Sequence, residues 1–351
     1  MTSFFEIIAS LCLGTLCVDH VLPVSQPMTQ AQCEASAPEV VDRWLTAHEG
    51  YSSDGKTCVA VTELQGKAAE VTEISPGQFV HFGAVEDIRP GTLGDVANTG
   101  FIIGTDAVAV IDAGTTRLIG EALYLAVRQQ TDLPIRWLIL THMHPDHILG
   151  SEVFQEAGAS LIGSDRLKTA IAIRAESYVA NFKRLLGDAV VHGTKVVLPD
   201  ASVDGTRDID LGDRVLTLAT YPTAHTNNDV TALDHKSNTI WMGDLVFLQH
   251  VPALDGSVNG WISVLEDMAK SSVAKIVPGH GRLVALHPDG LLPTRDYLKA
   301  LRQEVRAALK HGESLQTAIR HVGKDLQSDW QFFDAFNARN ATNAYIELEW
   351  E

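Results

Sequence analysis

The chain has 351 residues, of which 45% are hydrophobic and 20% are charged, so it can bury a full core and has the composition of a folded globular protein. Its 27 Lys and Arg residues and 44 Asp and Glu residues give a formal charge of -17, which repels phosphate backbones and disfavours nucleic acid as a partner. No apolar run approaches the ~20 residues of a membrane span, so we expect no membrane-spanning segment.

All four cysteines lie near the start of the chain: Cys12, Cys17, Cys33 and Cys58. An even number in a short terminal segment indicates two disulfides, with three possible pairings, in an oxidising compartment. Four reduced thiols are the alternative, and a zinc site is less favoured because no pair has the two-residue gap of zinc knuckles. We interpret residues 1-66 as a small prefix domain with a helix near residues 38-48 and little core of its own.

The first 18 residues make a poor export signal, because no Lys or Arg precedes the apolar stretch and Glu6 interrupts it. The disulfides nevertheless predict a periplasmic or exported protein, whose signal would lie upstream of Met1 or be absent from this sequence. Reduced thiols would return the protein to the cytoplasm.

From residue 67 to residue 289, short β-branched runs that end at Gly or Pro alternate with helical patterns, which predicts a layered α/β domain. The predicted strands are GQFVHFG, TGFIIG, AVAVIDAG, RWLIL, TKVVLP, RVLTLATY, TIWMGD and KIVPG. The predicted helices cover residues 116-130, 164-186 and 261-270. Residues 290-351 form a helical C-terminal extension, since apolar residues recur there at helical spacing.

Four residues of metal-ligand type lie directly after the predicted strand RWLIL: His142, His144, Asp146 and His147. In an extended chain His142 and His144 point to the same side and can reach one ion, while Asp146 and His147 can serve a second. Zinc takes three or four such ligands, so two sites need further residues.

Three further candidates each follow another predicted strand: His225, Asp244 and His280. Alone, each is as often a loop histidine or a helix-capping aspartate. In series behind the first cluster they complete a dinuclear metal site.

The order T-H-x-H-x-D-H, then a lone His, then G-D and P-G-H-G resembles the metallo-β-lactamase superfamily. The resemblance implies a four-layered αβ/βα sandwich. The implied ligands are His142, His144 and His225 for a first zinc, Asp146, His147 and His280 for a second, and Asp244 as a bridge. Asp112, in VIDAG, is similar to an early Asp motif of the superfamily that orders the metal loop without touching the ions.

A closer resemblance runs from the FEI…C…C…CE prefix through FVHFGAVEDI, LTHMHPDHILGS, RAESY, PTAHTNND, GDLVFLQHVPALDGS and FDAFNARN to ELEWE. These segments are similar to the quinoprotein relay system zinc metallohydrolases. That family is named for its genomic company with quinoprotein dehydrogenases and cytochromes, and its members are generally exported. The resemblance therefore implies a functional link to a quinoprotein dehydrogenase or a cytochrome.

Two zinc ions can hold a bridging hydroxide at neutral pH and polarise the carbonyl that it attacks, so no Ser or Cys nucleophile is required. Asp244 would orient the hydroxide, and Asp146 would accept or relay a proton. We expect hydrolysis of a small ester, thioester, lactone or lactam-like substrate. The candidates for contact with the rest of that substrate are Glu176, Tyr178, His250, Asp255 and Trp261.

Two other classes of function stay open at this point. The first is a mononuclear iron oxygenase that acts on a thiol or persulfide and uses fewer of the ligands. The second is a non-catalytic metal-binding accessory protein, although seven filled ligand positions argue against a decayed site. The sequence does not separate the scissile bonds or give the oligomeric state.

Overall fold

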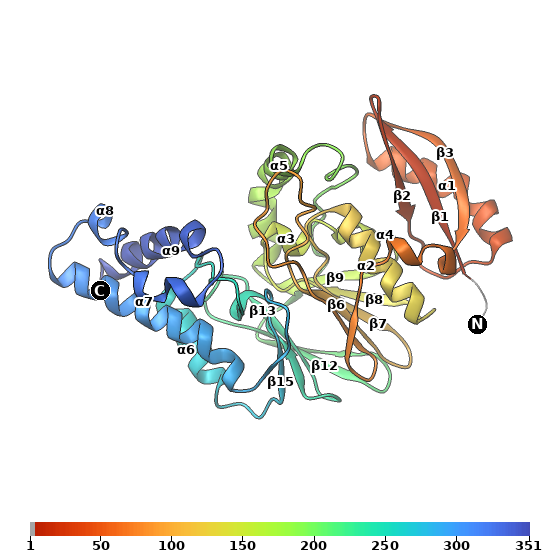
Figure 1. Cartoon of the computed structure of the whole chain (residues 1–351). Helices are drawn as coiled ribbons and strands as arrows, with labels where there is room; N and C mark the ends of the chain where they lie inside the picture. Colours follow the sequence, from red (N-terminus) through yellow and green to blue (C-terminus); the bar gives the residue numbers. More distant parts are fainter. Residues whose placement is uncertain (1–3) are drawn as a thin grey trace.

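Two β-sheets face each other at the centre of the computed structural model, which describes residues 4–351 (Figure 1). Helices cover the outer face of each sheet, which makes the four-layered αβ/βα sandwich that the motifs predicted. An N-terminal unit lies beside the helices of the first sheet, and the C-terminal helices lie on the second, at the opposite end of the molecule (Figure 1).

The first sheet has seven strands in the order β10-β9-β8-β7-β6-β5-β4. Their bounds are β4 Thr72–Ser75, β5 Gln78–His81, β6 Thr99–Ile103, β7 Val108–Ile111, β8 Ile135–Ile139, β9 Ser160–Ser164 and β10 Ala201–Val203. Strands β4 to β7 are antiparallel and β7 to β10 are parallel, as short hairpins and helical crossovers require. Alternate residues serve opposite faces: Val108 and Val110 pack on the helices, while Ala109 and Ile111 pack toward the second sheet.

The crossover helices of the first sheet are α2 Arg117–Gln130, α3 Pro145–Ile148, α4 Ser151–Glu156 and α5 Leu167–Leu186. Helix α2 begins after Thr116, whose hydroxyl accepts a hydrogen bond from the backbone N–H of Ile119. Helix α3 is a single short turn that begins at Pro145, which suits the first helical position. The metal motif thus continues from the end of β8 into this turn.

The second sheet has six strands in the order β11-β12-β13-β14-β15-β16. Their bounds are β11 Thr206–Asp210, β12 Val215–Thr220, β13 Val230–Asp234, β14 Thr239–Trp241, β15 Lys275–Val277 and β16 Ala285–Leu286. Only β14 and β15 pair in parallel, and α6 Val258–Met268 connects them. Helices α7 Leu292–Lys310, α8 Leu315–Ala318 and α9 Phe333–Leu348 complete the outer layer. Between the sheets, Trp241 lies so close to Gly100 that any side chain there would collide with its ring.

The N-terminal unit is a three-stranded antiparallel sheet of order β2-β1-β3 with one helix. Its elements are β1 Phe5–Leu13, β2 Leu16–Leu22, α1 Gln30–Ala47 and β3 Tyr51–Ala60. The apolar stretch around Glu6 is therefore the central strand of this sheet. The expectation of little core was wrong, because α1 and the sheet enclose a cluster of buried apolar residues that includes Leu11, Leu22, Val41 and Trp44.

Two disulfides tie this unit together. Cys12 pairs with Cys17 across the β1–β2 hairpin, and Cys33 of α1 pairs with Cys58 of β3. Of the three pairings that the sequence left open, the structure has the one in which one disulfide closes the β1–β2 hairpin and the other joins α1 to β3.

A buried arginine joins the N-terminal unit to the first sheet's helices. Arg117 of α2 is 1% exposed and binds the carboxylates of Glu121, Glu152 and Glu156. Its Nη2 also donates to the backbone oxygen of Val21 in β2, at 3.1 Å. Buried charges are stable only when they are paired and hydrogen-bonded, and this guanidinium meets both conditions.

Most predicted elements agree with the structure, but the strand TKVVLP was wrong. Residues 194-199 make no ladder and connect α5 to β10. Their β-branched pattern reflects packing, since Val196 and Val197 lie against the helical core and Lys195 donates to the backbone oxygen of Ala47. The boundaries at residues 66 and 289 stay predictions. In residues 4–351 no helix is long and apolar enough to span a membrane.

Candidate metal centre

The seven predicted ligands come together at one edge of the two sheets. His142, His144, Asp146 and His147 lie on the loop and turn after β8. His225 follows β12, Asp244 lies in the turn after β14, and His280 follows β15. Strand ends that meet at the same edge bring these residues together across 139 positions of sequence, from 142 to 280 counted inclusively.

The side chains form two groups, each with ligand atoms within 4.8 Å of one another. The first group is His142, His144, His225 and Asp244, and the second is Asp146, His147 and His280. Asp244 also reaches the second group, with its Oδ1 3.2 Å from His147 Nε2 and its Oδ2 3.3 Å from His280 Nε2. Its carboxylate therefore lies between the groups, in the position of a bridge.

In each of the five histidines of the cluster, one ring nitrogen is hydrogen-bonded to an oxygen atom outside the cluster. The pairs are His142 Nδ1 with Thr141 Oγ1, His144 Nε2 with Asp255, His147 Nδ1 with Asp112, His225 Nδ1 with the Ala253 oxygen, and His280 Nδ1 with the Val96 oxygen. Metal-bound histidines are oriented in this way, because the second nitrogen fixes the tautomer and the ring plane. The other nitrogen of all five rings is left for the centre of the cluster.

Two buried atoms at the centre fit a metal ion. His147 Nε2 and Asp244 Oδ1 lie 3.2 Å apart and are shielded from water, and neither makes a hydrogen bond to another group in residues 4–351. Such atoms are costly unless something satisfies them. A Cβ on Gly279 would lie 2.0 Å from Asp244 Oδ1, so glycine in P-G-H leaves room for the carboxylate. Imidazole nitrogens and carboxylate oxygens are the donor set that zinc takes.

A family model of the metallo-β-lactamase superfamily matches residues 92–280, more than half of the chain and the whole ligand series. The chain belongs to this superfamily. A metallo-β-lactamase from Pontibacter korlensis is similar in structure, with a TM-score of 0.54 and 19% identity over 66% of this chain and 98% of that one. The stereoselective inverting sec-alkylsulfatase Pisa1 from Pseudomonas sp. is similar with a TM-score of 0.62 and 15% identity, over 80% of this chain and 50% of that one. These likenesses show the fold, and no curated protein matches significantly.

Asp112 supports the superfamily's metal loop from behind. Its Oδ1 accepts the backbone N–H of Thr141 at 2.8 Å, while its Oδ2 accepts the Thr141 hydroxyl and faces His147 Nδ1, each at 2.8 Å. Asp112 has φ of 56°, a left-handed conformation that costs a non-glycine residue energy. The turn places the Asp112 carboxylate where it contacts both ends of the loop, Thr141 and His147.

Burial and charge act in opposite directions on the metal-free cluster. Burial lowers the pKa of His225 to about 3, so this ring stays neutral and able to bind metal at neutral pH. Burial would also lower the pKa of His147, but the carboxylates of Asp244, Asp112 and Asp146 outweigh it and raise that pKa well above its usual value. The centre therefore holds enough negative charge to attract a cation.

A cavity of about 300 Å³ opens beside the metal cluster. His144, Asp146, Asp244 and His280 form its floor. The walls include residues that were not predicted as substrate contacts: Glu86, Asp87, Ile88, Phe182, Phe247, Phe336 and Arg339. All but Phe182 lie in segments that carry the closer family resemblance. Phe336 and Arg339 come from α9, so the C-terminal extension contributes to the site. Only the fold brings that helix, some 190 residues after His144, to the metal cluster.

The five predicted substrate contacts have different positions. His250 lines the cavity. Asp255 joins His144 Nε2, at 3.1 Å, to Arg339, at 3.2 Å, and so orients a ligand and a wall residue. Trp261 was wrong as a substrate contact, because it is fully buried, lies edge-on to His225 and donates its indole N–H to the Leu245 oxygen. Glu176 is exposed on α5 and Tyr178 packs against the helical core, and neither lines the cavity.

Proposed function

We propose that the protein is a hydrolase with two zinc ions at this centre. One observation carries the proposal: five buried or half-buried imidazoles each have one nitrogen held by an oxygen, and their other nitrogens converge around Asp244. A single tetrahedral ion cannot use seven ligands, whereas two ions can share them. Bound zinc supplies Lewis acidity and lowers the pKa of water to near neutral.

The chain's own residues would position the reactants. Asp244 fixes the spacing of the two groups, and Asp146, which lies 3.4 Å from His280 Nε2, is on the cavity floor and can accept a proton from the attacking water or pass it on. His250 holds the Val251 oxygen through Nδ1 at 2.6 Å, and burial lowers its pKa to about 4. Its neutral ring therefore offers Nε2 as a hydrogen-bond acceptor for the substrate.

The cavity favours a compact substrate with an apolar part. Phe182, Phe247 and Phe336 supply flat apolar surface, and about 300 Å³ is at the lower end of ligand pockets. Arg339 is the one Lys or Arg among the described residues that line it, which suits a single carboxylate or polarised carbonyl. We propose a small ester, thioester, lactone or lactam-like bond as the target, with nucleic acid excluded by charge.

We further propose that the protein works in an oxidising compartment, because disulfides persist there and are rare in the cytosol. Both disulfides lie in the N-terminal unit, away from the metals. The motif resemblance also supports membership of the quinoprotein relay system zinc metallohydrolases and a link to a quinoprotein dehydrogenase or cytochrome. Disulfide mapping of natively exported protein tests the compartment, and four free thiols there would contradict it.

Metal analysis with a substrate panel tests the activity. We expect two equivalents of zinc per chain, turnover of at least one acyl substrate, loss of turnover on chelation and recovery with zinc. Asp244→Ala should lower the metal content and remove turnover, whereas Asp204→Ala, on an exposed turn, should change neither. One equivalent of iron with no zinc, together with oxidation of a thiol, would instead establish the oxygenase. Metal binding with no turnover of any panel member would favour an accessory protein.

A further inference from the structure

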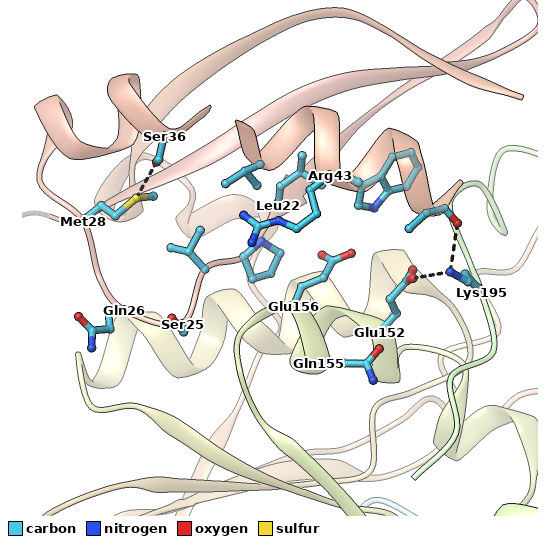
Figure 2. Close-up of a pocket in the computed structure, with 15 residues that line it drawn as sticks. Leu22, Ser25, Gln26, Met28, Ser36, Arg43, Glu152, Gln155, Glu156 and Lys195 are labelled. Atoms are coloured by element: carbon cyan, nitrogen blue, oxygen red, sulfur yellow. Dashed lines mark hydrogen bonds and ion pairs between the residues drawn. The ribbon is translucent and has the colours of Figure 1, made fainter. Parts of the chain in front are cut away.

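A second cavity lies away from the candidate metal centre, between the N-terminal unit and α4 (Figure 2). Its volume is about 590 Å³, compared with about 300 Å³ at the metal centre. Ligand pockets commonly measure ~300–1,000 Å³. Helix α1 and the segment from Leu22 to Met28 form one side, and Glu152, Gln155 and Glu156 of α4 form the other (Figure 2).

Much of the lining is apolar. Leu22, Met28, Val40 and Trp44 are buried in the N-terminal unit's core, yet they also line the cavity. Trp44 is 4% exposed, and its indole N–H has no hydrogen-bond partner in residues 4–351. That nitrogen is shielded from solvent, so Trp44 offers the cavity the apolar part of its ring, which suits a ligand with an apolar body.

The carboxylates of Glu152 and Glu156 in α4 already have partners inside the protein. Glu152 accepts from His48 and Arg117 and lies 3.5 Å from Lys195, and Arg117 binds both oxygens of Glu156. Burial raises the pKa of Glu156 against the opposing charge of Arg117. The carboxylate oxygens of Glu152 and Glu156 are therefore already engaged by partners inside the protein.

Arg43 is different, because its charge is not compensated. It makes no ion pair or side-chain hydrogen bond within the described chain, although it lines the cavity. Figure 2 shows its side chain reaching from α1 over the space above α4, on the side of Glu156. Among the charged residues that line this cavity, exposed Arg43 is therefore the one left without a partner in the described chain.

We propose that this cavity binds a small amphipathic anion, with its apolar body against Met28, Val40 and Trp44 and its acidic head on the Arg43 guanidinium. A guanidinium pairs with carboxylate or a similar planar anion through two parallel hydrogen bonds. The ligand would contact both the N-terminal unit and α4. The proposal does not depend on what the metal centre does.

Three probes with one tail and different heads test the proposal: decanoate, decanamide and decylammonium. Each is titrated by calorimetry into the full-length, metal-loaded protein with its disulfides intact. We expect decanoate to bind at one site per chain. Its affinity should be at least about tenfold higher than that of the neutral amide, because one hydrogen bond between charged groups contributes about that factor. Decylammonium should bind more weakly than the amide.

Two variants locate the site. Arg43→Met keeps the side-chain length and should weaken decanoate about tenfold while leaving decanamide unchanged. Val24→Trp, on the half-buried loop of the cavity wall, should block all three probes by filling the space. Arg320→Met, an exposed arginine elsewhere, is the matched control and should change nothing.

Thermal unfolding of each variant without a probe shows that the fold is retained. Decanoate binding that is unchanged in both Arg43→Met and Val24→Trp would overturn the proposal, because the carboxylate would then lie elsewhere, for instance on the metals. Equal affinity for the three heads would overturn the assignment of the ligand as an anion. No binding of any probe up to millimolar concentration would overturn the site.

Discussion

Replacing Arg117 with Met should destabilise the protein by about 3 kcal/mol at pH 8. Removing one partner of a buried ion pair costs ~3–5 kcal/mol, because the remaining charge stays buried without compensation. Glu121 keeps His20, at 2.8 Å, and Glu152 keeps His48, at 3.0 Å. Glu156 loses both of the hydrogen bonds that Arg117 donates to it, but its side chain is 22% exposed and can turn toward solvent, which places the expected cost at the lower end.

The assay is urea unfolding at several pH values. Without the guanidinium that opposes it, burial raises the pKa of Glu156 further above its value in the unfolded chain. The resulting loss of stability is present at pH 8 and disappears as pH falls and Glu156 takes up a proton. The difference in the free energy of unfolding between Arg117→Met and the wild type should therefore become smaller toward pH 5. Arg117→Lys keeps the charge but cannot span three carboxylates, so it should be intermediate. A loss under 1 kcal/mol at pH 8, or one that grows toward pH 5, would refute the reasoning.

Three further outcomes are expected. Burial raises the pKa of Glu6 from 4.5 to about 7. The free energy of unfolding of the wild type, measured by urea unfolding, should therefore fall by about 3 kcal/mol as pH rises from 4.5 past 7. In Glu6→Gln this decrease should be smaller. The double variant Cys33→Ala/Cys58→Ala opens a loop of 25 residues and should lower the free energy of unfolding by about 3.5 kcal/mol. Cys12→Ala/Cys17→Ala opens a loop of 5 residues and should lower it by about 2 kcal/mol. Equal losses would contradict the dependence on loop length. Asp112→Asn should weaken metal binding about 10–100-fold in chelator competition while Asp204→Asn does not, and unchanged affinity would show that the His147 tautomer needs no carboxylate.

The ligand positions could be predicted because each follows a strand in the sequence. A strand end fixes where the next residue lies, so His142, His225 and His280 meet once the sheets form. The alternation of strands and helices predicted a layered α/β domain, the resemblance to the metallo-β-lactamase superfamily implied four layers, and this fold was confirmed. The place of Phe336 and Arg339 in the cavity wall could not be predicted, although both lie in the segment FDAFNARN, because the docking of α9 depends on the whole second sheet.

Contacts between residues that lie far apart in the sequence also could not be predicted. The sequence gives no sign that His20 contacts His192, 172 positions away, or that Arg117 faces Glu156. The cysteine pairing likewise depended on how α1 packs on β3. The β-branched run at residues 194-199 misled because Val196 and Val197 are partly buried without pairing, and burial and strand formation leave the same pattern in a sequence.

The contacts around α2 give a physical reason why the N-terminal unit and the metal loop behave as one structure. Helix α4 begins at Ser151, four residues after His147, and its carboxylates bind Arg117 of α2. Between them Gly120 of α2 packs directly on Gly150, where a Cβ would lie 2.6 Å from the Gly150 oxygen. Interiors at this density transmit displacement instead of absorbing it. We therefore expect a shift of the N-terminal unit on Arg117 to reach the segment that carries three of the candidate metal ligands, His142, His144 and His147.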